Sequence, residues 1–412
     1  MSKLTKYKFS DLYSMSSGIS STKEQAGHGS PFLSFSVVFN NYFVPDILND
    51  LMASSEKEKE RYSIKSGDIF LTRTSEVVDE LAMSCVAVKD YPNATFSGFL
   101  KRLRPTQDNI TYPKFMAFYL RSPMFRKTMT NNAVMTLRAS LNEAIFSYLE
   151  LLLPAYSEQK KAGDLLYLLN HKIALNNRIN AELEGMAKTL YDYWFVQFDF
   201  PDANGKPYKT SGGKMEYNAT LKREIPAGWA VKTLSQIADI TMGQSPAGET
   251  YNDNGIGTLF FQGSTDFGWL FPTPRQYTTS PARMAKKGDI LLSVRAPVGD
   301  MNIANADCCI GRGLAALNSK SGSDGFLFYV MKYFKQVFDR RNAEGTTFGS
   351  MTKDDLHSLK VVCPEPELLK RYDGIVSEYN KMIFTRSLEN QDLIKLRDWL
   401  IPLFMNGQVT VK

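Results

Sequence analysis

The chain has 412 residues, of which 43% are hydrophobic and 22% are charged. This composition excludes a disordered or fibrous chain, and the length predicts two or three globular units, not one. The 49 Lys and Arg residues exceed the 43 Asp and Glu residues, and the resulting net charge of +6 permits contact with a polyanion without requiring it.

Targeting and metal-binding signals are missing. The N-terminal sequence MSKLTKYKFSDLY has no apolar core, and no run approaches the roughly 18 apolar residues of a membrane helix, so we expect a soluble cytoplasmic protein without membrane contact. No histidine has a second ligand at helical spacing, and no zinc site is expected. Buried free thiols are expected at all four cysteines, Cys85, Cys308, Cys309 and Cys363.

Residues 1–153 form the first predicted domain. Turn-forming clusters at 16–18, 27–31 and 66–68 separate short β-rich runs such as 32–39 and 69–73. A helix is predicted at 113–129, with proline in its first turn. Strands followed by a helix indicate an α+β domain.

A long helix is predicted at 154–198. Its apolar positions repeat at intervals of three and four residues, as in a coiled coil, and the predicted length is about 60 Å for about 40 residues. The repeat turns polar in the middle, at Asn176 and Asn180. The predicted seam is Leu166, Leu169, Ile173, Asn176, Asn180, Leu183, Ala187, Leu190 and Trp194.

An ordered connector is predicted at 199–218, because the passage is polar and rich in glycine. The aromatic run FVQFDFP at 195–201, which spans the end of the helix and the start of the connector, has two interpretations. It plugs the end of the helix against a domain, or it forms a free aromatic patch that binds a partner.

The second predicted domain, 219–363, repeats the plan of the first, and a second long helix with a C-terminal tail follows at 364–412. The sequence GDIFLTR at 67–73 matches GDILLSVR at 288–295, with a drift of one residue at the arginine. The second helix turns polar at Arg386 and Glu389. Its predicted seam is Leu368, Tyr372, Ile375, Tyr379, Met382, Arg386, Glu389, Leu393, Leu396, Leu400 and Leu403.

Together these patterns predict an α+β fold in which two similar domains are separated by a pair of long antiparallel coiled-coil helices, related as a pseudo-twofold tandem repeat. In this arrangement the polar midpoints meet and fix the register, with Asn176 near Arg386. Alternatively, the helices pack against the domains and their heptads are incidental.

Catalytic signatures are missing. SGGKM at 211–215 lacks the spacing and hydroxyl residue of a phosphate-binding loop, and GRG at 311–313 lacks the third glycine of a dinucleotide-binding turn. No HExxH, GxSxG or amino-methyltransferase tetrad occurs. We therefore expect no intrinsic catalysis.

Candidate DNA-binding residues lie in the loops of both domains, where cations, amides and hydroxyls suited to phosphates and base edges gather. Recurrence beside the repeated Gly-Asp strand favours Arg73 and Arg295. The candidates of the first domain are Ser20, Ser21, Thr22, Lys23, Arg73, Thr74, Ser75, Lys101, Arg102 and Arg104, and those of the second are Gln244, Ser245, Gln262, Ser264, Arg295 and Arg312.

Four stretches carry a resemblance to a known family. They are LYDYWF at 190–195, GDILLSVRAPVG at 288–299, GTTF at 345–348 before KDDL at 353–356, and LRDWL at 396–400 before MNG at 405–407. Together with the order domain, helix, domain, helix, they resemble the specificity subunit of type I restriction-modification enzymes across nearly the whole chain.

The resemblance implies a non-catalytic subunit with two target recognition domains, each reading half of a bipartite, asymmetric double-stranded DNA site. It implies docking of two methyltransferase subunits on the helical regions, where Tyr191, Tyr193, Trp194, Phe195 and Trp399 are the candidate contacts. Endonuclease subunits join that core. The resemblance implies no cofactor in this chain, and places S-adenosylmethionine, ATP and Mg in the partners.

Two other classes remain open. A two-headed protein-binding scaffold would bind without the loss of affinity in salt that phosphate contacts produce. A nuclease or methylase with a cryptic site would be active as the isolated chain.

Overall fold

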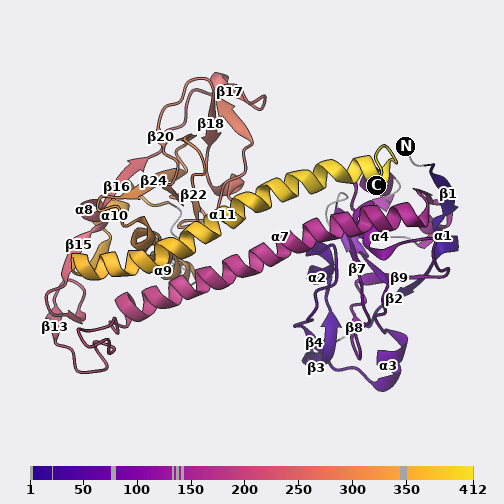
Figure 1. Ribbon diagram of the computed structural model, residues 1–412, viewed down its shortest axis with the longest axis horizontal. Helices are drawn as coiled ribbons and strands as arrows, with labels where there is room; N and C mark the ends of the chain where they lie inside the picture. Colours follow the sequence, from indigo (N-terminus) through magenta and orange to yellow (C-terminus); the bar gives the residue numbers. More distant parts are fainter. Residues whose placement is uncertain are drawn as a thin grey trace. The chain divides into compact units, whose positions relative to one another are not determined.

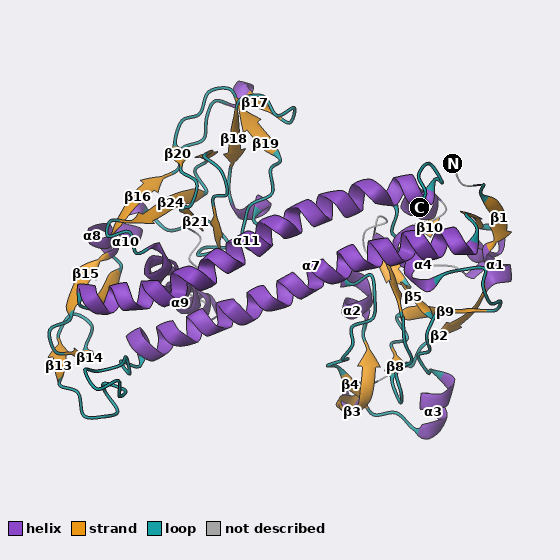
Figure 2. Cartoon of the chain, viewed as in Figure 1, coloured by secondary structure: helices purple, strands orange, loops and turns teal. Residues whose placement is uncertain are grey.

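The computed structural model describes residues 3–20, 22–75, 80–131, 134–135, 139–140, 143–343 and 350–411. The chain divides into two compact units, Met1–Leu175 with Asn390–Lys412, and Asn176–Glu389. Each unit contains one strand-rich domain and a part of both long helices (Figures 1 and 2). The predicted α+β class, with two similar domains each followed by a long helix, is confirmed.

Unit 1 holds the first domain. Its elements are β1 (Thr5–Lys8), α1 (Phe9–Leu12), β2 (Tyr13–Ser17), η1 (Lys23–Gln25), β3 (Ala26–Leu33), α2 (Phe35–Asn40), β4 (Leu51–Met52), α3 (Glu56–Arg61), β5 (Ile69–Thr72), β6 (Thr74–Ser75), β7 (Ser84–Val86), β8 (Thr95–Phe96), β9 (Leu100–Pro105), α4 (Pro113–Tyr119), α5 (Pro123–Asn131), β10 (Val134–Met135), β11 (Ala139–Ser140), α6 (Glu143–Tyr148) and β12 (Glu150–Leu153).

The first domain is organised around a four-stranded antiparallel sheet with the order β2-β9-β5-β7. Central strand β5 is buried on both faces, which explains its nearly continuous apolar sequence. Phe70 packs on Phe96 of the smaller β4-β3-β8 sheet, with ring centroids 5.1 Å apart. Its neighbours Ile69 and Leu71 face the opposite core, which contains Phe115 and Phe118 of α4.

Unit 2 holds the second domain. Its elements are β13 (Met215–Asn218), β14 (Arg223–Pro226), β15 (Ala230–Thr233), α8 (Leu234–Ile237), β16 (Ala238–Met242), η4 (Gly248–Thr250), β17 (Tyr251–Asn252), β18 (Thr258–Phe261), η5 (Ser264–Asp266), β19 (Gln276–Thr278), β20 (Met284–Ala285), β21 (Ile290–Ser293), β22 (Met301–Ile303), β23 (Cys308–Ile310), β24 (Leu314–Ser319), α9 (Asp324–Ala343), α10 (Lys353–Ser358) and β25 (Lys360–Cys363).

The second domain repeats the first down to single hydrogen bonds. Its sheet has the order β16-β24-β21-β22, which matches β2-β9-β5-β7. At the turn before the central strand, the Asp68 carboxylate accepts the Lys65 N–H at 2.7 Å, and the Asp289 carboxylate accepts the Lys286 N–H at 2.8 Å. The predicted tandem repeat is therefore a repeat of backbone structure as well as of sequence.

Each domain also begins and ends in the same way. β1 pairs antiparallel with β12 in the first domain, and β15 pairs antiparallel with β25 in the second. The strands β12 and β25 are the extended apolar runs that precede each long helix. The chain therefore enters and leaves each domain along adjacent strands.

The predicted strand at 32–39 is wrong beyond its first two residues, because β3 ends at Leu33 and α2 follows. The Arg121 guanidinium donates to the carbonyls of Val38, Phe39 and Asn41 at 2.8–2.9 Å, and so satisfies the C-terminal end of this short helix. Such a contact from a distant residue overrides the strand preference of valine and phenylalanine.

The connector is ordered, as predicted. The Asp199 carboxylate accepts hydrogen bonds from the Thr210 amide and hydroxyl, at 2.8 and 2.7 Å. Phe200 stacks between Tyr208 and Trp229, with centroid distances of 4.6 and 5.1 Å. The end of this passage forms β13, which pairs with β14 as a hairpin.

The long helices are α7 (Tyr156–Tyr191), which continues as a π-helical turn η3 (Asp192–Val196), and α11 (Pro366–Met405). In unit 1, Arg397 of α11 donates to Asn170 of α7 at 3.1 Å. In unit 2, Asn176 donates to Glu389 at 2.8 Å, and Asn180 donates to Ser387 at 3.3 Å. Later residues of α7 thus meet earlier residues of α11, and the predicted antiparallel pairing is confirmed.

The predicted seam of α7 is confirmed, since Leu166, Ile173, Asn176, Asn180 and Ala187 are all buried. The predicted seam of α11 is wrong by one residue after Tyr372. The exposed side chains include the predicted Ile375, Met382 and Leu396, whereas the buried ones are Val376, Ile383, Ser387, Asn390, Ile401, Phe404 and Met405.

From Val376 onward the buried positions keep the heptad spacing, since Val376, Ile383, Asn390 and Phe404 are separated by multiples of seven residues, but the seam lies one residue further along the helix than predicted. The predicted contact of Asn176 with Arg386 is wrong for the same reason. Asn176 meets Glu389, and the Arg386 guanidinium instead donates to the Met382 carbonyl of its own helix at 3.3 Å.

All four cysteines are free and buried, as predicted. Burial raises the pKa of Cys85 and of Cys308 to about 12, so both stay protonated and unreactive near neutral pH.

The register of the helix pair can be tested by cross-linking. Cysteines in place of Asn180 and Ser387 are expected to be joined by a short bifunctional thiol reagent, because these side chains touch across the pair. The pair Asn176→Cys with Arg386→Cys serves as the control and is expected to remain unjoined. Efficient joining of the control pair alone, seen as altered gel mobility, would contradict the register.

The two buried turn carboxylates should differ in their contribution to stability. Asp68 is fully buried and forms a bidentate ion pair with Arg104, whereas Asp289 accepts from neutral Asn318. Asp68→Ala should therefore destabilise the first domain by about 3 kcal/mol, and Asp289→Ala should destabilise the second by about 1 kcal/mol. Native-state hydrogen exchange at β5 and β21 measures both effects, and equal losses would refute the distinction.

Candidate nucleic-acid interface

Four predicted residues of the second domain come together at one edge of its sheets. The Ser245 hydroxyl and the Gln262 side-chain amide are hydrogen-bonded, with Nε2 to Oγ at 2.9 Å. The Arg312 backbone N–H donates to the same hydroxyl at 3.3 Å, and the Gln244 N–H donates to the Ile310 carbonyl at 3.0 Å. The side chains of Gln244, Gln262 and Arg312 are exposed.

Arg295 belongs to the neighbouring loop. Central strand β21 continues past its end, because the Val294 N–H donates to the Gly313 carbonyl at 2.9 Å. The next residue, Arg295, is exposed and pairs through its backbone with Ser350. The predicted residue Ser264 starts η5, on the loop that follows β18.

The first domain builds the same edge with other side chains. The Gly98 N–H donates to the Ile19 carbonyl at 2.7 Å, and the Arg73 N–H donates to the Phe99 carbonyl at 2.9 Å. Arg73 and Ser20 are exposed beside these bonds, and Thr74 is half-buried. Thr22 and Lys23 are exposed at η1, where the Thr22 N–H donates to Gln25 at 2.9 Å. Ser21 and the side chain of Ser75 lie outside the described residues.

The predicted drift of one residue between Arg73 and Arg295 is seen in the register of the two sheets. Thr72 pairs with Leu100 and Ser293 pairs with Leu314, so the residue that follows in register is Arg73 in one domain and Val294 in the other. Val294 is buried, and the exposed cation comes one position later. The two edges therefore have the same backbone hydrogen-bonding pattern, but the exposed arginine comes one residue later in the second domain.

Three predicted cations of the first domain have structural partners. The Lys101 ammonium donates to the Ser17 hydroxyl at 2.8 Å, and the Arg102 guanidinium donates to the Ser63 carbonyl at 2.7 Å; both side chains are buried. Burial lowers the pKa of Arg102, whereas the Asp68 carboxylate raises the pKa of Arg104. These contacts hold the domain together, and the candidate interface comprises the exposed residues.

The sequence reasoning missed Phe99. A phenylalanine that precedes a buried strand resembles a core residue, yet this side chain is 66% exposed. The repeat aligns Gly98-Phe99 of the first domain with Arg312-Gly313 of the second. This alignment would have indicated that Phe99 belongs to the turn at the candidate interface.

Most of the aromatic candidates for partner binding are buried. Tyr191, Trp194 and Phe195 lie in the core of unit 2, where Phe195 packs on Phe326 and on Tyr372 with centroids 5.0 and 4.9 Å apart. The aromatic run therefore packs the end of the helix against the second domain. Because these three side chains are buried there, they are no longer candidates for partner contacts.

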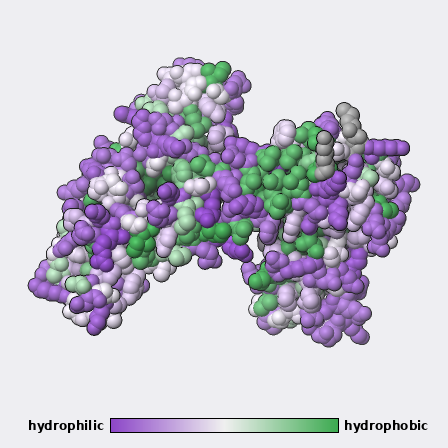
Figure 3. All heavy atoms as spheres, in the orientation of Figure 1, coloured by the Kyte–Doolittle hydropathy of each residue, from purple (hydrophilic) through white to green (hydrophobic). Residues whose placement is uncertain are grey.

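Two aromatic candidates, Tyr193 and Trp399, are exposed at 38% and 64%. Trp399 lies on α11 near exposed Ile394 and Leu396, where Figure 3 shows a hydrophobic stretch over this part of the helix. Leu396 lies one turn from Trp399 on the same side of the helix, and this exposed apolar pair is a candidate protein-binding site.

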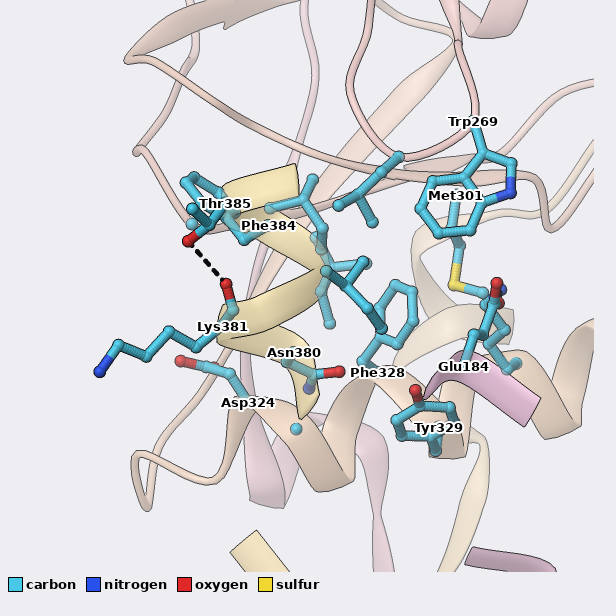
Figure 4. Close-up of a pocket in the computed structure, with 17 residues that line it drawn as sticks. Glu184, Trp269, Met301, Asp324, Phe328, Tyr329, Asn380, Lys381, Phe384 and Thr385 are labelled. Carbon is cyan, nitrogen blue, oxygen red and sulfur yellow. Dashed lines mark hydrogen bonds and ion pairs between the residues drawn. The ribbon is translucent and has the colours of Figure 1, made fainter. Parts of the chain in front are cut away.

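A cavity of about 340 Å³ lies within unit 2 (Figure 4). Phe328 and Tyr329 of α9, Phe384 of α11 and Trp269 line it, and the ion pair between Lys332 and Glu184 lies at its wall. Burial raises the pKa of Tyr329, so its hydroxyl stays neutral. The lining is mostly apolar, and it offers no arrangement typical of hydrolysis or group transfer.

Metal-binding and membrane-spanning features are missing from the part of the chain that the structure describes. Its His, Cys, Asp and Glu side chains nowhere gather in a group of three that could hold a metal ion. None of its helices combines the length and apolar character that crossing a bilayer requires.

Comparison with known proteins shows the family. The family described as "Type I restriction modification DNA specificity domain" matches residues 2–185 and 226–368. The chain is 30% identical over 368 residues to a putative type I restriction enzyme MjaX specificity subunit of Methanocaldococcus jannaschii, covering 85% of this chain and 80% of the relative.

Two further similarities agree. The HindI specificity subunit of Haemophilus influenzae is 22% identical over 92% of this chain and 94% of its own. The solved type I S subunit of M. genitalium shares the fold, with a TM-score of 0.60 at 14% identity over 98% of this chain and 96% of that one. The family supplies the non-catalytic component of its enzymes. This chain belongs to the type I restriction-modification DNA specificity family, and its function is to confer DNA sequence specificity.

Proposed function

We propose that each domain reads one half of a bipartite, asymmetric double-stranded DNA sequence. The observation that carries the proposal is the recurrence of one exposed loop edge, held by the same backbone hydrogen bonds, in both domains. Because the exposed side chains at the two edges differ, the two halves of the site differ in sequence.

In the second domain, the exposed edge carries groups suited to base edges and phosphates. The Gln262 amide can donate and accept toward an adenine in the major groove, and its hydrogen bond to Ser245 limits its rotation. Arg295 and Arg312 can form bidentate hydrogen bonds to guanine or to phosphate. In the first domain, Ser20, Thr22, Lys23, Arg73 and Thr74 occupy the same edge.

The chain acts as a scaffold for catalytic partners. The exposed apolar face of α11 around Trp399 is proposed to dock a methyltransferase subunit, two of which bind each chain, and endonuclease subunits join that core. S-adenosylmethionine, ATP and Mg act in those partners, and this chain needs no cofactor of its own. The complex works on DNA in the cytoplasm.

The long helices set the unread gap between the half-sites. Both are unbroken across the boundary between the units, which falls after Leu175 in α7 and after Glu389 in α11. A paired helix bends little over this length, so the gap should follow the number of helical residues.

Arginine substitutions test which domain reads which half. Arg295→Ala in the reconstituted complex should reduce discrimination at the second half-site by about 10-fold, the cost of a lost bidentate base contact, and leave the first unchanged. Arg73→Ala should do the reverse. Methylation of a library randomised at each half-site measures both.

Arg178→Ala, on the exposed face of α7, is the control and should change neither half-site. Equal weakening on all sequences, with a smaller salt slope, would reduce the arginine concerned to a phosphate contact.

A paired deletion tests the helical spacer. Removing 176–179 from α7 and 387–390 from α11 shortens each helix by roughly 6 Å. The preferred gap should decrease by one or two base pairs, while both half-site sequences stay the same. A deletion in one helix only is the control for misfolding, and an altered half-site in the paired deletion would contradict the proposal.

A further inference from the structure

The first domain exposes an aromatic ring at the centre of its candidate interface. Phe99 is 66% exposed, and it lies directly opposite Arg73, because the pairing of Thr72 with Leu100 continues by one residue. Directly opposite residues in an antiparallel pair project from the same face, with Cβ atoms about 5 Å apart. A cation and a large apolar ring therefore stand side by side on this edge.

The ring is exposed on a fixed backbone. The Phe99 carbonyl accepts the Arg73 N–H at 2.9 Å, and the Phe99 N–H donates to the Ser97 hydroxyl at 3.2 Å. The flanking Gly98 N–H donates to Ile19 at 2.7 Å, and the following Leu100 is fully buried. A rigid turn that holds an apolar side chain in solvent is prepared for a contact, because it loses little conformational entropy on binding.

The second domain excludes such a ring. Its residue at the position of Phe99 is Gly313, where a Cβ atom would lie 2.7 Å from the Gln262 carbonyl oxygen. The residue before it is the exposed Arg312, at the position of Gly98, where a Cβ atom would lie 2.8 Å from the Ile19 carbonyl oxygen. The turn therefore has the sequence Gly-Phe in the first domain and Arg-Gly in the second, because neither glycine position has room for a side chain.

We propose that Phe99 is a specificity-determining residue that makes an apolar contact with a base of the first half-site, beside a phosphate or base contact from Arg73. Aromatic side chains contact the thymine methyl group or insert at a flexible base step. The second domain reads the corresponding position with the Arg312 guanidinium. The inference rests on the proposed reading of DNA by the two domains.

The test uses the complex reconstituted with its methyltransferase subunits and DNA libraries randomised at each half-site. Phe99→Ala should lose about 10-fold of its discrimination at one or two adjacent base pairs of the first half-site and none at the second. Phe99→Leu, which keeps an apolar side chain, should recover most of the loss if the contact is to a methyl group.

Two probes identify the contact in the wild-type complex. Replacing thymine by uracil at the sensitive position reproduces the loss if Phe99 touches the methyl group. A rise in 2-aminopurine fluorescence that Phe99→Ala abolishes shows insertion at a base step. Either result supports the inference.

Tyr148→Ala is the matched control, an aromatic residue of the same domain that is 68% exposed and lies outside the candidate interface. If the wild type discriminates at both half-sites and Phe99→Ala is indistinguishable from it, the inference is wrong and the proposed function stands. If the wild type shows no preference within the first half-site, the proposed function fails, and the inference fails with it.

Discussion

A buried carboxylate closes the turn that starts the central strand of each domain. Asp68 and Asp289 each accept a backbone N–H from three residues earlier, at 2.7 and 2.8 Å. The turn aims β5 and β21 through the middle of their sheets, with both faces buried. The far end of each central strand leads into the exposed loop edge, so this turn lies at the opposite end of the strand from the residues of the candidate interface.

The two domains combine one frame with two sets of side chains. Their shared hydrogen bonds keep the backbone of the edge the same, while small shifts move the exposed groups. One edge carries Arg73 opposite Phe99, and the other carries Arg295 and Arg312 around a buried Val294. A repeated frame with different exposed side chains is well suited to two half-sites of unlike sequence.

The sequence predicted the architecture because its signals are redundant. The apolar positions of the long helices recur over many turns. The two similar Gly-Asp strands indicate the tandem repeat of the domains. The prediction failed at α2, because the side chain that caps this helix is Arg121, which is distant from it in the sequence. It also failed in the register of α11, where the buried seam keeps its heptad spacing but lies one residue later, because adjacent positions of this helix, such as Ile375 and Val376 or Met382 and Ile383, are both apolar.

The candidate site was predictable by region but not by residue. The sequence does not distinguish an arginine whose side chain is exposed to solvent, such as Arg73, from one whose side chain is buried and donates to a backbone carbonyl, such as Arg102. Exposure also separates Trp399 from the buried Trp194, although both stand near the end of a long helix. Those distinctions come from packing between segments that are far apart in the sequence.

The paired strands at the base of each domain have one more consequence. Since β1 lies against β12, and β15 against β25, over four residue pairs each, the two points where a domain joins the rest of the chain are neighbours. A domain attached in this way behaves as a cassette. If each domain reads one half-site, as proposed above, then exchanging the segment between such strands would change the recognised half-site and leave the long helices as they are.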